Sequence, residues 1–85
     1  MRASMPPRRT GPKVPEAILF GARVRKLREA RDWTQERLAE ESGLNTVQIS
    51  HIENGRNEPK LRTILWLAKA LGVRAGELID QIKVR

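Results

Sequence analysis

The stretch from Gln35 to Gly55 most constrains what this chain can fold into, because it predicts two short helices joined by a tight turn. Thr34 and Asn45 are favourable N-cap residues, whose side chains accept a hydrogen bond from an early backbone N–H. Gln48 follows Asn45 by three residues, which is the spacing of a capping box. Gly43, between the two helices, can adopt the left-handed conformation that ends a helix. Gly55 is expected to end the second helix in the same way.

A further helix is expected before this pair. It begins near Glu16, just after Pro15, and ends at Asp32 and Trp33. Its apolar residues recur at helical spacing and form one stripe, made of Ala17, Phe20, Val24 and Leu27. Its basic residues Arg23, Lys26 and Arg31 are expected to point away from this stripe, towards solvent or a ligand.

Two more helices are expected after the pair. One covers about Leu61 to Leu71 and stops at Gly72, although Lys60 is not a capping residue. A short last helix, from about Ala75 to Gln81, would dock Leu78 and Ile79. Residues 82–85 alternate apolar and basic, as a short strand or a loose end would. Strand patterns are otherwise absent, so the predicted class is all-α with five helices.

Charge and composition divide the chain into three parts. Residues 1–31 carry nine Lys or Arg against two acidic residues, whereas residues 32–85 carry eight of each. Residues 1–15 are rich in Pro and basic residues and poor in apolar ones, so we expect a flexible basic arm. Residues 16–81 form the single domain and residues 82–85 a tail. A one-sided basic field favours a polyanionic partner, nucleic acid more often than membrane, with a merely solubilising tail as the alternative.

The sequence offers almost nothing for catalysis or metal binding. It has no Cys and one His, and Glu40 and Glu41 are adjacent, so they cannot share a helix face. We therefore expect no enzyme activity, no metal site and no cofactor. No apolar run approaches the roughly 18 residues that span a bilayer, and no signal peptide is recognisable. The expected location is the cytoplasm.

Two helices joined by a short turn containing Gly form a helix-turn-helix motif. Ala39 is small enough for the helices to cross closely, and apolar residues hold the pair to the body, namely Leu38, Leu44, Ile49 and Ile52. The outward face of the second helix is small and polar and lacks Lys and Arg, comprising Thr46, Val47, Gln48, Ser50 and His51. Such a face suits contact with base edges in a DNA major groove.

From about Phe20 to Ile79 the chain resembles the lambda-repressor-like, XRE-type family of helix-turn-helix regulators. The resemblance rests on RVRKLREARDWTQERLAEESGL, on IS-x-IENGR followed by Pro59, and on LAKALGV. It implies a compact five-helix bundle that binds double-stranded DNA, commonly as a homodimer on a palindromic operator. The predicted function is a sequence-specific, repressor-type transcription regulator.

The resemblance also implies roles for individual residues. Base-reading positions are Thr46, Val47, Ser50 and His51. Phosphate-binding positions are Thr34, Gln35, Gln48, Asn54, Arg56 and Asn57, and Gln35 can also brace the start of the recognition helix. Arg28 and Glu53 match a partly buried structural ion pair. Arg8, Arg9 and Lys13 of the arm are candidates for further DNA contacts.

Two departures from the family pattern leave alternatives open. Trp66 stands where an exposed polar residue is usual, and is either a partly buried aromatic or a dimer or partner contact. Arg74 and Gly76 replace the usual caps of the last helix, which weakens a dimer built on that helix. The alternative functions are an antitoxin or restriction-system controller with the same fold, or a protein-interaction module that uses Trp66 and the C-terminal segment.

Overall fold

Five α-helices account for most of the residues that the computed structural model describes, which are residues 15–82. They are α1 (Pro15–Glu29), α2 (Gln35–Ser42), α3 (Thr46–Glu53), α4 (Leu61–Leu71) and α5 (Ala75–Ile79). No strand occurs within this range, so the all-α prediction is confirmed. Residues 1–14 and 83–85, which hold most of the predicted arm and tail, lie outside the described residues.

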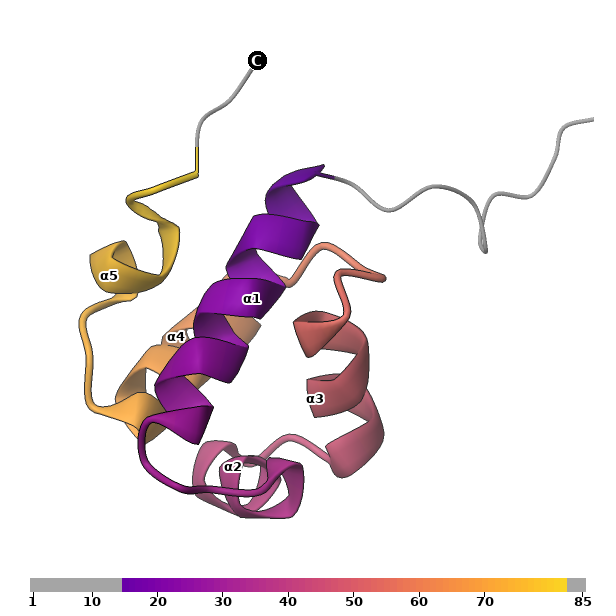
Figure 1. Ribbon diagram of the computed structural model, residues 1–85, viewed down its shortest axis with the longest axis vertical. Helices are drawn as coiled ribbons and strands as arrows, with labels where there is room; N and C mark the ends of the chain where they lie inside the picture. The colour runs from indigo at the N-terminus through magenta and orange to yellow at the C-terminus, as the bar shows by residue number, and fades with distance from the viewer. Residues whose placement is uncertain (1–14, 83–85) are drawn as a thin grey trace, which may run out of the picture.

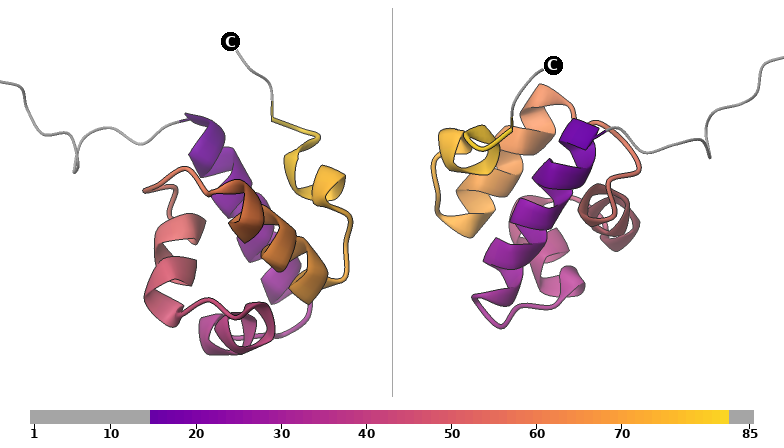
Figure 2. Two further views of the ribbon diagram at one scale, coloured as in Figure 1. Left: turned by 180° about the vertical axis from the view of Figure 1, so that it is seen from behind. Right: turned by 45° about the horizontal axis from the view of Figure 1, so that its top comes forward.

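The helices pack around α1, which runs through the middle of the molecule (Figure 1). In that view α4 lies behind α1, α3 and α5 lie on opposite sides of it, and α2 closes the lower end. Contacts join α1 to α3, α4 and α5, and join α2 to α3 and α4. Figure 2 shows from two more directions that α3 lies at one side of the bundle.

One hydrophobic core fills the space between the helices. Every helix contributes to it, and its buried residues are Phe20, Val24, Leu38, Ala39, Leu44, Ile49, Ile52, Leu67, Ala68, Leu71 and Leu78. Leu27 and Trp33 pack against this core from its edge. None of the described helices is long and apolar enough to cross a bilayer.

The predicted helix ends around the central pair are confirmed. Thr34 Oγ1 accepts a hydrogen bond from the Arg37 N–H at 3.0 Å and caps α2. Asn45 and Gln48 form a complete capping box, with N–O distances of 2.8 and 2.9 Å. Gly43 ends α2 at φ 84°, and Gly55 follows α3 at φ 69°. Because each cap is a local hydrogen bond or a local backbone conformation, neighbouring residues alone specify it.

Two predicted boundaries were wrong. The first helix ends at Glu29, and a turn follows in which Asp32 has φ 58°. The Arg28 guanidinium donates to the Trp33 carbonyl at 2.7 Å, which fixes this turn against α1. The last helix ends at Ile79, whose side chain is 42% exposed, so only Leu78 enters the core.

Gly21 lies where α1 touches the end of α3, a contact that was not predicted from the sequence. A Cβ atom at this position would lie 2.0 Å from the Ile52 carbonyl oxygen and 2.9 Å from that of Glu53. Any side chain would therefore collide with the backbone of α3. A glycine inside an otherwise regular helix was the available signal.

Candidate nucleic-acid interface

The recognition-helix candidate α3 is anchored on one side and open on the other. Ile49, Ile52 and Glu53 are buried against the body. On the open side Val47 is 63% exposed, the largest exposure among the predicted base-reading residues, and Thr46, Ser50 and His51 are half-buried. These four residues follow the i, i+1, i+4, i+5 spacing of one helix face, so the structure brings the predicted base-reading set together.

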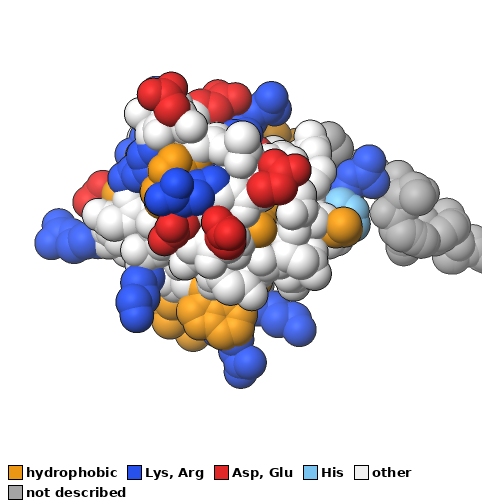
Figure 3. All heavy atoms as spheres, turned by 90° about the horizontal axis from the view of Figure 1, so that it is seen from below, with side chains coloured by type: hydrophobic (Ala, Val, Ile, Leu, Met, Phe, Trp, Pro, Cys, Tyr) orange, Lys and Arg blue, Asp and Glu red, His pale blue; other side chains and the backbone are white. Residues whose placement is uncertain are grey.

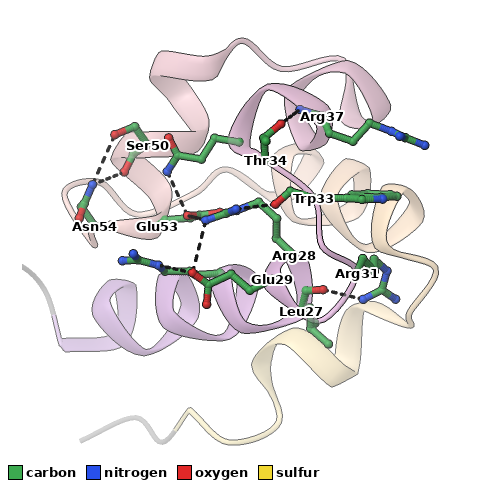
Figure 4. A network of polar contacts seen from close by, with 12 residues as sticks. Leu27, Arg28, Glu29, Arg31, Trp33, Thr34, Arg37, Ser50, Glu53 and Asn54 are labelled. Carbon is green, nitrogen blue, oxygen red and sulfur yellow. Dashed lines mark hydrogen bonds and ion pairs between the residues drawn. The ribbon is translucent and has the colours of Figure 1, made fainter.

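A buried ion pair fixes the end of α3 to α1. Arg28 Nε donates to Glu53 Oε2 at 2.7 Å, and a second guanidinium nitrogen donates to Oε1 at 3.0 Å (Figure 4). The Glu53 side chain is 1% exposed and that of Arg28 is 10% exposed. Hydrogen bonding to Glu53 is the main cause that raises the pKa of Arg28 above its ordinary value. The Arg28 guanidinium therefore keeps its positive charge in the folded protein.

Gln35 extends this network to α2. Its Nε2 donates to Glu53 Oε1 at 3.0 Å, so it braces the end of α3. From the sequence it was expected to brace the start of α3. Through Glu53 the first turn of α2, the last turn of α1 and the last turn of α3 share one carboxylate. This carboxylate and the close contact at Gly21 fix the orientation of α3 relative to α1 and α2.

Three other predicted phosphate-binding residues have structural partners. The Thr34 and Gln48 side-chain oxygens accept the capping hydrogen bonds of α2 and α3. Asn54 Nδ2 donates to the Ser50 carbonyl at 2.8 Å, which orders the loop after α3 (Figure 4). Arg56 and Asn57 are exposed in that loop. Gln48 lies at the start of α3 and the loop lies at its end, so these two sets of residues flank the base-reading face.

A groove of about 310 Å³ runs between α3 and the start of α4. Its lining comprises Gln48, His51, Ile52, Asn57, Glu58, Pro59, Lys60 and Thr63. Lys60 and Thr63 were not predicted as site residues, and Lys60 was considered only as a poor cap. Lys60 places a cation in the same groove as the loop residue Asn57, where it could attract a negatively charged DNA phosphate.

Of the basic residues predicted to face solvent or a ligand, Arg23 and Arg31 form hydrogen bonds within the protein, whereas Lys26 is exposed as predicted. Arg23 Nε donates to the Glu77 carbonyl at 3.1 Å, and Arg31 donates to the carbonyls of Leu27 and Leu71. Arg25 pairs with Glu29 at 3.2 Å. Within residues 15–82, no group of three His, Cys, Asp or Glu side chains is placed to hold a metal ion.

Residues 24–78 match the family model HTH_3, described as helix-turn-helix. The control protein C.BamHI of Bacillus amyloliquefaciens is 41% identical over 64 residues, which are 74% of this chain and 79% of that protein. The transcriptional repressor RghR of Bacillus subtilis is 49% identical over 55 residues, which are 64% of this chain and 41% of that protein. The crystal structure of the restriction-modification controller C.AhdI from Aeromonas hydrophila superposes with a TM-score of 0.74 at 38% identity, covering 76% of this chain and 98% of that one.

These relatives differ in length. The chain spans 22% of the uncharacterised transcriptional regulators that it matches in Mycobacterium tuberculosis and Mycobacterium bovis, at 38% identity. The likeness to those proteins and to RghR is confined to one part of each. The likeness to C.AhdI extends over almost the whole of that smaller protein.

Proposed function

The chain belongs to the HTH_3 family of helix-turn-helix DNA-binding regulators, and on this premise we propose that it controls transcription by reading one operator sequence with α3. It acts in the cytoplasm as a repressor-type regulator and performs no catalysis. Its target is double-stranded DNA, which α3 enters along the major groove.

The observation that carries this proposal is the composition of the open face of α3 together with its rigid support. Thr46, Ser50 and His51 offer donors and acceptors for base edges, and Val47 offers an apolar contact for a thymine methyl group. Because this face holds no Lys or Arg, it suits base edges better than phosphates. The Arg28–Glu53–Gln35 network keeps the face at a fixed angle to the body.

Phosphate contacts come from the residues around α3. Gln48 contacts phosphate at the start of α3, and Asn54, Arg56 and Asn57 do so at its end, where Thr34 and Gln35 also approach α3. Lys60 joins the second group because it lines the same groove as Asn57. These contacts set the position of α3 on the duplex without reading sequence. The operator is a palindrome bound by a homodimer, with half-site centres about 34 Å apart.

The controllers of restriction-modification systems suggest a more specific role. The match covers 98% of the C.AhdI chain and 79% of C.BamHI, so most of each of these controllers corresponds to this domain. The second candidate is therefore a controller that times the expression of neighbouring genes through occupancy of its operator.

The test begins with selection of bound sites from random duplexes, followed by Thr46→Ala and His51→Ala variants. Each variant should weaken binding to the selected site by roughly tenfold, since a good base contact is worth about 1–3 kcal/mol, and leave binding to random DNA nearly unchanged. Arg56→Ala is the matched control and should weaken both kinds of DNA alike. Equal losses on both DNAs for Thr46→Ala and His51→Ala would refute the assignment of α3 as the reading helix.

A further inference from the structure

The outer face of α4 carries the most prominent apolar surface that the DNA-binding role leaves unused. Leu61 is 72% exposed, Leu65 49% and Trp66 43%. They occupy positions i, i+4 and i+5 of one helix, so they share one face. A packed helix normally turns such residues inward, and α4 already buries Leu67, Ala68 and Leu71 on its opposite side. We call Leu61, Leu65 and Trp66 the α4 patch.

Positive charge surrounds the α4 patch. The segment from Lys60 to Leu71 contains Lys60, Arg62 and Lys69 and no acidic residue. The Arg62 guanidinium carbon lies 5.9 Å from the centroid of the Trp66 ring, which places the cation on the edge of the apolar surface. Figure 3 shows hydrophobic side chains gathered at one edge of the molecule between Lys and Arg side chains, with the acidic side chains lying away from them.

The patch is also hollowed at one end. Lys60, Leu61, Arg62 and Leu65 line a depression of about 420 Å³. Two of its lining side chains are apolar and two are cationic. An occupant would therefore bury apolar side chains against the leucines while placing carboxylates beside Lys60 and Arg62.

We propose that the α4 patch docks an acidic amphipathic helix of another protein. The Trp66 ring supplies the large rigid anchor that is typical of protein interfaces, and the surrounding cations select Asp and Glu on the partner. This interaction goes beyond DNA binding, because the three apolar residues of the patch lie outside the face of α3 and the loop after it, and only Lys60 borders both surfaces.

Other parts of this chain fit the patch poorly. Residues 1–14 and 83–85 contain no Asp or Glu. The acidic helix α2 exposes Glu36, Glu40 and Glu41, but it has none of the exposed large apolar residues. A two-fold contact between two α4 patches would bring their Arg and Lys residues together, and like charges oppose such a contact. Ile79 with its acidic neighbours Glu77 and Asp80 offers one large exposed apolar residue against the three of the patch.

The test uses a designed 16-residue helical peptide with Leu at i, i+4 and i+7 and Glu on the flanking positions, labelled with fluorescein. Binding to the full chain is followed by fluorescence anisotropy. We expect the peptide to bind, with affinity at least about tenfold lower for Trp66→Glu and for Leu61→Glu. Leu61 is the more exposed of the two, so Leu61→Glu preserves the test if Trp66→Glu affects folding. Both variants should bind the selected operator half-site as the unmodified chain does.

Two matched variants separate the patch from other surfaces. Ile79→Glu changes an equally exposed apolar residue, and Arg56→Ala removes a cation from the DNA-facing loop. Both should bind the peptide within about twofold of the unmodified chain, since neither residue lies in the patch. A peptide with the same composition in shuffled order should bind at least about tenfold less well, because it lacks a continuous apolar face.

Four results would overturn the proposal. The first is failure of the peptide to bind, and the second is equal binding of the shuffled peptide, which would indicate charge alone. The third is self-association in sedimentation that Trp66→Glu abolishes, which would assign the patch to a second copy. The fourth is binding of phosphatidylglycerol and phosphatidylcholine vesicles in place of the peptide, which would assign it to a lipid surface.

Discussion

The carboxylate of Glu53 connects three helices through one buried group. It accepts hydrogen bonds from Arg28 and Gln35 while its side chain is 1% exposed. We expect Glu53→Gln to lower the free energy of unfolding by roughly 3 kcal/mol, because the Arg28 guanidinium would lose its buried counter-charge and keep only the exposed Glu29 carboxylate, 3.9 Å away. Urea denaturation of the variant and the unmodified chain measures this difference.

The exposed pair Arg25–Glu29 provides the control at the same scale. Its side chains are 55% and 56% exposed, so Arg25→Ala should cost less than about 1 kcal/mol. The double variant Arg28→Met with Glu53→Leu should regain more than half of the lost stability. Recovery is incomplete because the Trp33 carbonyl loses its Arg28 donor. Equal costs for Glu53→Gln and Arg25→Ala would contradict a structural role for the buried pair.

Between elements, α1 packs closely against the end of α3 at Gly21. Ala has the higher helix propensity by about 1 kcal/mol, so local preference alone predicts that Gly21→Ala stabilises α1. The Ile52 carbonyl oxygen lies 2.0 Å from the new Cβ position, and a backbone atom cannot move aside as a flexible side chain can. We therefore expect a net destabilisation of roughly 2 kcal/mol in thermal or urea unfolding.

Gly76→Ala is the matched control, since Gly76 is also helical. There the nearest atom to an added Cβ is Asp80 Oδ1 at 3.4 Å, which is on a side chain that can adjust. This substitution should be neutral or slightly stabilising. A stabilised Gly21→Ala variant would show that α1 and α3 are packed less tightly than the structure indicates.

The difference between local and long-range contacts explains which features could be predicted from the sequence. The caps at Thr34, Asn45 and Gly43 depend on residues a few positions apart, so composition and spacing sufficed. Contacts between residues that are far apart in the sequence were harder to predict. Nothing near Arg31 in sequence indicates that it reaches the Leu71 carbonyl. Likewise the exposure of Ile79 follows from the shortness of α5 and not from its apolar pattern.

For the candidate site, the sequence predicted the exposed face of α3 but not the groove beside it. The outward residues of α3 follow from helical periodicity once the helix ends are known. Lys60 and Thr63 join the site only because the chain folds back after Pro59 to form the groove beside His51. The Arg28–Glu53 pair was expected from family resemblance, and its buried geometry agrees with that expectation.

At the scale of the whole molecule, positive charge is concentrated at the chain ends. Arg2, Arg8, Arg9 and Lys13 lie in residues 1–14 and Lys83 and Arg85 at the C-terminus, so these segments carry six of the seven net charges and residues 15–82 carry +1. Arg23 and Arg28 of α1, and Arg31 just after it, form hydrogen bonds within the protein. Attraction to the DNA backbone should therefore depend more on the N-terminal residues than on α1. From the sequence alone, the basic residues of α1 were expected to contribute to this attraction as well.

Deletion of residues 1–13 tests this division between attraction and reading. It removes four cations, and each phosphate that is no longer neutralised should reduce the slope of log K against log salt by about 0.9. We expect weaker binding to selected and random DNA alike, with the ratio between them retained, because the base-reading face of α3 is intact. Replacement of the same four residues by Gln in the full-length chain separates the effect of charge from that of length. If the slope stays unchanged in both proteins, the N-terminal residues do not touch the DNA backbone, and Lys60 and Arg56 must provide the attraction instead.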